Sequence, residues 1–387
     1  MGNYFFLQVF TVIFALSIAT TIFNKRILGF PQAIGVPIVS AIFVFILQWG
    51  ASLLSGNQFI TINIHNIEEA VRHIDFYDFL INGVICFILT SSALKFKVSD
   101  LRSYWKPISI LASIALVLCA VFFGVVLYGY QFIIGQHVDL LVLLLLGAAL
   151  GATDPIGIKG VLSSVRAPHH LMVKLEGESL FNDAMCIALF MTLLNVLQGE
   201  NFTVMGVLQT LLYEIFVAVI IGWAFGLGIL RLLRGKHEME SLILTTALLA
   251  CGSYLVALFA HASAPIACVI GGLIVGNKWK EILQEREIRE VNHFWHTVEG
   301  IINSFLFTLI GLELFILDLS FSLIFGGIVA FIILHASRFA ANYLSFAFFP
   351  SFRKKSYNGS LAILSWGGVR GGFSLALIFA VVIVSVL

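Results

Sequence analysis

Residues 176–197 read EGESLFNDAMCIALFMTLLNVL, and the only charges in this stretch are Glu176, Glu178 and Asp183. An apolar run needs about 20 residues to cross a bilayer, so this stretch is long enough to span one. A charged side chain at mid-bilayer depth costs about 2.5 to 3.5 kcal/mol even on lenient insertion scales. Something must offset that cost, and a functional role is the usual reason.

The composition is that of a polytopic membrane protein. Of the 387 residues, 60% are hydrophobic and 11% are charged, whereas soluble domains average about 25% charged residues. The net charge of +1 gives no support for nucleic-acid binding. The five cysteines lie in apolar runs without metal-type spacing, so we interpret them as reduced packing residues.

Twelve apolar spans are predicted, which makes the fold all-α. They cover about 4–22, 32–54, 78–95, 107–130, 138–161, 172–198, 204–230, 241–261, 265–277, 296–317, 321–348 and 358–387, and the ninth is short. The first span has no preceding basic residue and no small-residue cleavage site, so we expect it to stay as a helix.

The distribution of Lys and Arg predicts the orientation, because these residues collect in cytoplasmic loops. The loops after spans 1, 3, 5, 7, 9 and 11 hold 18 of the 22 basic residues, and the opposite loops hold only Arg72. The N-terminus is therefore expected outside, and so, after twelve spans, is the C-terminus.

Charged residues within the apolar spans include Asp154, Lys159, Glu176, Glu178, Asp183, Arg338 and Arg370. At 1.5 Å per residue, four of them from four different spans are expected near mid-depth: Asp154, Asp183, Arg338 and Arg370. Two of these spans are predicted to be broken. GATDPIGIKG (151–160) places Pro155 among glycines, and WGGVRGG (366–372) surrounds Arg370 with glycines.

Unwound backbone at membrane depth is typical of ion-coupled transporters. Pro and Gly also occur freely in transmembrane helices, and Thr153-Asp154-Pro155 can be an ordinary helix N-cap. That alternative stays open for each break taken alone.

Helical spacing places the polar residues of 176–183 on two adjacent faces of the predicted helix. Glu176, Ser179 and Asp183 share one face, which could offer oxygens to a hard cation, and Glu178 and Asn182 share the adjacent one. The second face could dock a buried base such as Arg338. Glu176, nearest the cytoplasmic end, is interpreted as a solvated funnel residue.

The motifs ATDP (152–155) and EGESLFND (176–183), followed by FWHTVEGIINSFLFTLIGLEL (294–314) and WGGVRGGFSLAL (366–377), resemble those of sodium/proton exchangers of the NhaP/NHE type. The resemblance implies inverted repeats, a homodimer and elevator-like alternating access. It also implies a Na⁺ site at Thr153, Asp154, Ser179 and Asp183, and a buried structural triad of Glu178, Asn182 and Arg338.

One transmembrane domain, 1–387, is therefore predicted. Repeat one covers about 1–198, a linker helix about 204–230, and repeat two about 241–387, with the broken spans 5 and 12 crossing. Two features depart from the family. Ser91 stands where members often carry a Glu on helix 3, and the usual thirteenth helix is expected to be missing or closed differently.

The predicted function is exchange of Na⁺, or another monovalent cation, for H⁺. Burial favours the protonated form of a carboxyl group, so protons and the cation should compete at Asp183. Exchange should be electroneutral, one for one. No P-loop is present, so the ion gradient should supply the energy, with no cofactor beyond the transported ions. The expected setting is a bacterial inner membrane, and an enzyme is not expected.

Other functional classes fit the sequence less well or equally well. A serine hydrolase could use Ser179 with His261 or His335, but the sequence lacks the glycine expected two residues after Ser179. A cation channel would need a carbonyl filter or a ring of charges, and LYGYQ (127–131) is not such a filter. A K⁺-selective exchanger or a cation symporter is not excluded by the sequence.

Overall fold

The structure, a computed structural model, describes residues 5–53, 79–153, 168–199, 203–235, 238–316, 321–347, 358–366 and 377–378. Within these ranges all regular secondary structure is helical. The elements are α1 (Phe5–Phe23), η1 (Asn24–Leu28), α2 (Gln32–Leu53), η2 (Phe79–Val84), α5 (Ile85–Lys95), α6 (Val98–Ile110), η3 (Leu111–Ala115), α7 (Leu116–Ile133), α8 (Leu140–Ala149), α10 (His169–Leu197), α11 (Val204–Leu232), α12 (Met239–Phe259), α13 (Ala264–Lys278), η4 (Trp279–Glu281), α14 (Glu285–Ile316), α15 (Phe321–Ala347) and α16 (Asn358–Trp366).

The predicted all-α membrane fold is confirmed. Each of the twelve predicted spans coincides wholly or partly with a helix, and the short ninth span is the 15-residue α13. Among the described residues, six helices are long and apolar enough to cross a bilayer. Large apolar side chains such as Phe45, Phe216, Phe259 and Phe331 are exposed, as expected of surfaces that face lipid.

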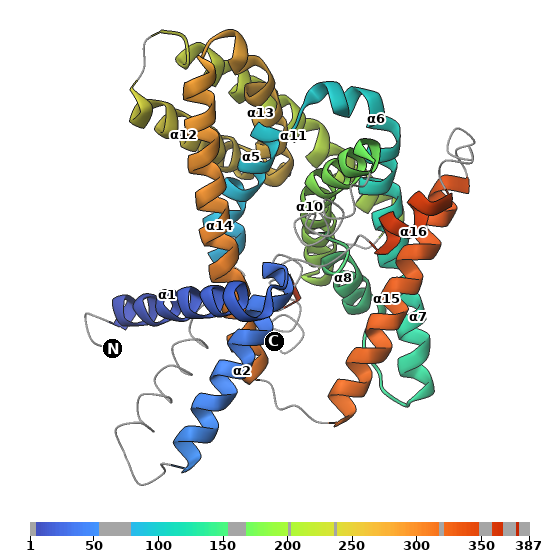
Figure 1. The fold of residues 1–387 in the computed structure, drawn as a ribbon. Helices are drawn as coiled ribbons and strands as arrows, with labels where there is room; N and C mark the ends of the chain where they lie inside the picture. The colour runs from blue at the N-terminus through green and yellow to red at the C-terminus, as the bar shows by residue number, and fades with distance from the viewer. Residues whose placement is uncertain are drawn as a thin grey trace.

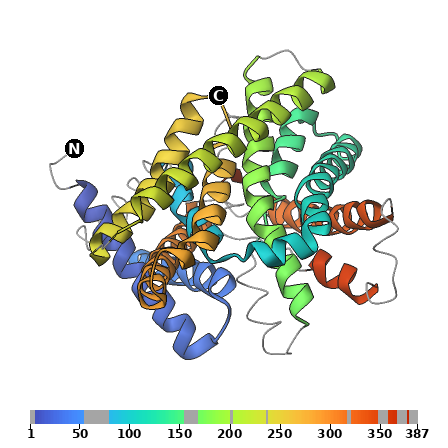
Figure 2. The ribbon, with the colours of Figure 1, turned by 90° about the horizontal axis from the view of Figure 1, so that it is seen from above.

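The helices form two groups that lie side by side (Figures 1 and 2). One contains α1, α2, α5 and α11–α14, and the other contains α6–α8, α10, α15 and α16. Each group combines helices from early and late parts of the chain. Helix α10 packs against α6 and α8 of its own group and also against α5, α11 and α13 of the other. The repeat boundaries stay a prediction.

Glycines allow the helices of the first group to approach closely. A Cβ added at Gly222 of α11 would lie 2.4 Å from the carbonyl oxygen of Ala267 in α13. A Cβ at Gly276 of α13 would lie 2.1 Å from the carbonyl oxygen of Leu94 in α5. Small residues at helix contacts are the usual basis of packing in a bilayer, where lipid is as apolar as the helix surfaces. This group is therefore tightly joined through α13.

Candidate functional site

Helix α8 ends inside the protein. It begins after Asp139, whose side chain accepts the backbone N–H of Leu141 at 2.8 Å, and it has only 10 residues, or about 15 Å. Ala148, Ala149, Ala152 and Thr153 at and beyond its end are all buried. The last carbonyl groups of a helix have no partner within the helix, so these must find partners elsewhere.

Side chains from one face of α10 provide those partners. The Cys186 thiol donates to the carbonyl oxygen of Ala148 at 2.9 Å, and Asn182 Nδ2 donates to that of Gly151 at 3.0 Å. The Ser179 hydroxyl donates to the carbonyl oxygen of Thr153. The spacing of 179, 182 and 186 keeps the three side chains on one side of the helix. Non-helical backbone is thus held in place at membrane depth because α10 satisfies it.

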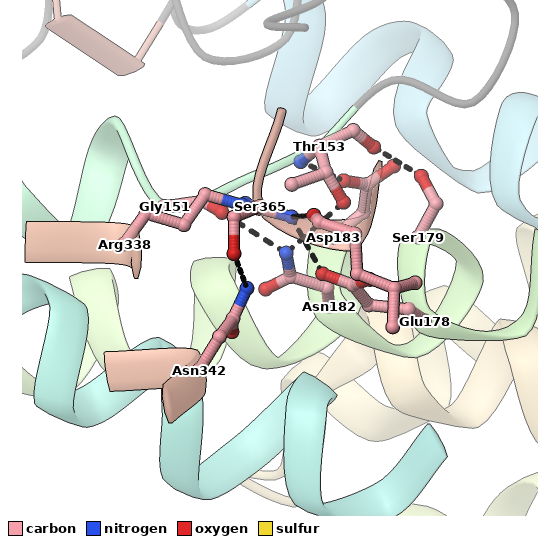
Figure 3. A network of polar contacts seen from close by, with 10 residues as sticks. Gly151, Thr153, Glu178, Ser179, Asn182, Asp183, Arg338, Asn342 and Ser365 are labelled. Carbon is pink, nitrogen blue, oxygen red and sulfur yellow. Dashed lines mark hydrogen bonds and ion pairs between the residues drawn. The ribbon is translucent and has the colours of Figure 1, made fainter. Parts of the chain in front are cut away.

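Thr153 is held on several sides (Figure 3). Its backbone N–H donates to Asp183 Oδ1 at 3.3 Å, and its Oγ1 accepts from Asn182 Nδ2 at 3.1 Å. The carboxylate of Asp183, the hydroxyl of Ser179 and two oxygens of Thr153 therefore lie in one small region. Oxygens of these kinds are the ligands that hard cations prefer.

A buried ion pair lies beside this region. Arg338 Nη2 of α15 is 2.6 Å from Glu178 Oε1, and the two side chains are 5% and 3% exposed. The same Nη2 donates to the carbonyl oxygen of Leu364 in α16 at 3.4 Å. Arg338 therefore connects α10, α15 and α16.

Six of the residues singled out in the sequence come together here: Thr153, Glu178, Ser179, Asn182, Asp183 and Arg338. Glu176 lies on the same helix and, like Asp183, is partly exposed, whereas Glu178, Ser179 and Asn182 are buried. Asp154, Lys159 and Arg370 lie outside the described residues. Asn182 differs from expectation, because its amide nitrogen bonds to Gly151 and Thr153 at the end of α8.

Sequence reasoning missed Cys186, Asn342 and Ser365. Cys186 continues the spacing of Ser179 and Asn182, and Asn342 lies one turn after Arg338, so helical periodicity could have found both. Ser365 lies directly before the predicted break at 366–372, and its role depends on a contact with α15 that the sequence does not specify.

Ser91 has an unexpected neighbour. Its buried hydroxyl donates to Glu299 Oε2 of α14 at 3.0 Å, and Lys95 Nζ lies 2.7 Å from the same oxygen. The resemblance noted in the sequence led us to regard the position of Ser91 on α5 as lacking a carboxylate, but α14 brings one to this place.

Comparison with known proteins agrees with the fold. The family model described as "Sodium/hydrogen exchanger, transmembrane" matches residues 13–383. The Na⁺/H⁺ antiporter NhaP of Pseudomonas aeruginosa is 34% identical over 371 residues, which cover 94% of this chain and 86% of that one. The Na⁺/H⁺ antiporter NhaG of Bacillus atrophaeus is 29% identical over 306 residues, 76% of this chain but 55% of NhaG.

Among solved structures, the sodium proton antiporter MjNhaP1 from Methanocaldococcus jannaschii superposes with a TM-score of 0.75. The alignment covers 98% of this chain and 86% of that one at 17% identity. At this identity the likeness establishes a shared fold.

Proposed function

Because this chain belongs to the sodium/hydrogen exchanger family, we propose that it is a secondary transporter that exchanges Na⁺, or another monovalent cation, for protons across a bacterial inner membrane. The observation that carries the proposal is the contact of Thr153 with Asp183 and Ser179 at the buried end of α8. This contact places a titratable carboxylate next to neutral oxygens in a region where an ordinary apolar helix would have neither.

In the proposed mechanism, protons and the cation compete for Asp183. Asp183 is partly exposed, while Ser179 and Thr153 beside it are buried. A protonated Asp183 has lost the charge that attracts a cation, and a bound cation in turn excludes the proton. The site therefore carries one ion or the other, and Ser179 and Thr153 add neutral oxygen ligands to the cation.

The ion pair of Glu178 and Arg338 has a structural role in this proposal. A buried carboxylate next to a guanidinium stays ionised, because losing either charge would leave the other buried alone. Glu178 then holds α15 against α10 and does not exchange its own proton. Asp183 is then the group proposed to exchange a proton during transport. Asp154 is the second candidate for such a group.

Alternating access would follow from movement between the two helix groups. The oxygens of the site come from Thr153, which follows α8, and from α10 of the same group. Helix α10 also packs on α5, α11 and α13 of the other group. A shift of the group that contains α8 and α10 against the other group would carry the site from one side of the membrane to the other. We propose a homodimer with the N-terminus outside, as the sequence predicts.

Proton movement in proteoliposomes tests the proposal. Vesicles with an internal pH dye should become acidic inside when an internal Na⁺ load is exchanged for external protons, and alkaline inside when Na⁺ is added outside. Li⁺ and K⁺ in place of Na⁺ would measure selectivity, and Asp183→Asn protein serves as the inactive control. Proton movement in the same direction as Na⁺ would identify a symporter, and no proton movement would refute exchange.

A further inference from the structure

The last residues of α16 are attached to α15 by two side chains one helical turn apart (Figure 3). Asn342 Nδ2 donates to Ser365 Oγ at 3.1 Å, and Arg338 Nη2 donates to the carbonyl oxygen of Leu364 at 3.4 Å. Asn342 and Ser365 are 2% and 5% exposed, so the amide and hydroxyl pair away from solvent. Two consecutive residues of α16 are thereby fixed at its end.

As at α8, side chains of a neighbouring long helix supply the polar contacts. There, a short helix ends at membrane depth and the continuous helix α10 holds its end through Ser179, Asn182 and Cys186. Here, Arg338 and Asn342 of the continuous helix α15 hold two consecutive residues of α16, Leu364 and Ser365. Arg338 also pairs with Glu178 of α10. A chain of polar contacts therefore runs from α8 through α10 and α15 to α16.

Burial of a polar side chain on α15 does not by itself produce such a contact. Ser345, three residues after Asn342, is 1% exposed, and its hydroxyl has no hydrogen-bond partner within the described part of the chain. Asn342 differs because its amide donates to Ser365. The preceding residue, Leu364, accepts a hydrogen bond from Arg338. The contact thus lies in the polar chain that leads to the site.

We propose that Asn342 and Ser365 are positioning residues for the cation site. Their hydrogen bond fixes the end of α16 relative to Arg338, and through Glu178 relative to the oxygens on α10. Loss of the bond lets the end of α16 and the Arg338 side chain shift, which weakens cation binding without removing a ligand. This inference rests on the proposed function, because it concerns the affinity of the same site.

A double-mutant cycle tests the pair. Asn342→Ala, Ser365→Ala and the double variant are compared with wild type for two quantities: the Na⁺ concentration that gives half-maximal exchange in proteoliposomes, and the melting temperature in detergent with and without Na⁺. Ser345→Ala is the matched control, since it removes a buried hydroxyl from α15 without breaking a hydrogen bond among the described residues.

Each single variant should raise the half-maximal Na⁺ concentration by about three- to tenfold, the factor that one hydrogen bond is worth. The half-maximal Na⁺ concentration of the double variant should be no higher than that of the more impaired single variant, because both substitutions break the same bond. The exchanged pair, Asn342→Ser with Ser365→Asn, should recover most of the affinity, and Ser345→Ala should behave as wild type.

Additive effects of the two substitutions, or a lower melting temperature with unchanged half-maximal Na⁺, would overturn the positioning role. Failure of the proposed function has a different signature: wild type itself would show no exchange. In that case the double-mutant cycle uses a different quantity, the rise in melting temperature that Na⁺, Li⁺ or K⁺ causes in wild type and in each variant. A wild type stabilised by none of the three overturns this inference as well.

Discussion

Arg338 Nη2 of α15 lies 2.6 Å from Glu178 Oε1 of α10, and both side chains are almost completely buried. Taking two charges out of water is costly, and only close pairing with further hydrogen bonds repays that cost. Arg338 has such a bond, to the carbonyl oxygen of Leu364. The pair therefore joins the helix that carries the candidate site to α15 and α16.

Replacing Arg338 with Ala should destabilise the protein by about 3 to 5 kcal/mol, because Glu178 would remain buried without its partner charge. Thermal or denaturant unfolding in detergent measures this. Arg286→Ala is the control, since it also breaks an Arg–Glu pair but an exposed one, and should change stability little. A melting temperature equal to wild type would argue that Arg370 is the better partner for Glu178.

The Asp183→Asn variant should fold normally but lose exchange. The amide keeps the shape of the side chain, and its oxygen can still accept the Thr153 N–H, but it cannot bind and release a proton. Na⁺-driven proton flux in proteoliposomes should fall to the level of empty vesicles, while the melting temperature stays close to that of wild type. Full exchange by this variant would remove Asp183 from the mechanism.

Ser179→Ala should weaken cation binding. The hydroxyl is a proposed ligand, and it also holds the Thr153 carbonyl in place. We expect the half-maximal Na⁺ concentration to rise by about tenfold, with a smaller effect on the maximal rate. Thr192→Val is a suitable control, because that hydroxyl lies on the same helix and bonds only to Ala188 of its own helix among the described residues. Equal affinities in the two variants would contradict a special role for Ser179.

Gly276→Ala should destabilise the first helix group. The added Cβ would lie 2.1 Å from the Leu94 carbonyl oxygen, a backbone atom that can move only if α5 and α13 separate. Overpacking of this kind costs about 1 to 3 kcal/mol. Gly300→Ala on α14 is the control, since nothing lies within 4 Å of its Cβ position. If the two variants melted alike, the close approach of α5 and α13 would be unimportant for stability.

The sequence predicted the helices well because the bilayer imposes a length and an apolar composition on each span. Two starting boundaries differ clearly. The tenth span was predicted to begin near residue 296, but α14 begins at Glu285. The fourth span was predicted to begin near residue 107, but helical structure extends from Val98 to Ile133. Arg102 and Lys106 in its first part are exposed, so these turns extend beyond the apolar run that defined the prediction.

Helical periodicity assigned residues to faces but could not identify their partners. It grouped Glu178 with Asn182 and led us to expect that both would meet Arg338. In the structure Glu178 does so, whereas the amide nitrogen of Asn182 turns to Gly151 and Thr153. The difference has a physical reason: the end of α8 leaves carbonyl groups that need a donor, and no sequence pattern states where those groups lie.

Ser91 illustrates a second limit of reading one helix at a time. Along α5, the position lacks the carboxylate that the family often has. Glu299 is more than 200 residues away in the chain, yet its carboxylate accepts a hydrogen bond from Ser91 and pairs with Lys95. Only tertiary packing of α14 against α5 brings these groups together.

The proposed stoichiometry rests on Asn182, which stands directly before Asp183. Two adjacent aspartates could release two protons for each cation, and each turnover would then move net charge across the membrane. An amide at residue 182 cannot titrate. Glu178 is another carboxyl group on α10, but we expect its ion pair with Arg338 to keep it out of the proton exchange. Glu176 is interpreted as a solvated funnel residue, so Asp183 is the carboxyl group on α10 that we expect to exchange a proton during transport.

If one proton exchanges for one monovalent cation, transport moves no net charge and membrane voltage cannot drive it. Proteoliposomes with valinomycin and different K⁺ gradients set the voltage while Na⁺ serves as the tested cation. We expect the Na⁺ and H⁺ gradients at equilibrium to be the same at every imposed voltage. An equilibrium that moves with voltage would require a second titrating group, and Asp154 would be the first to test, by repeating the measurement with Asp154→Asn. Restored voltage independence in that variant would assign the extra proton to Asp154.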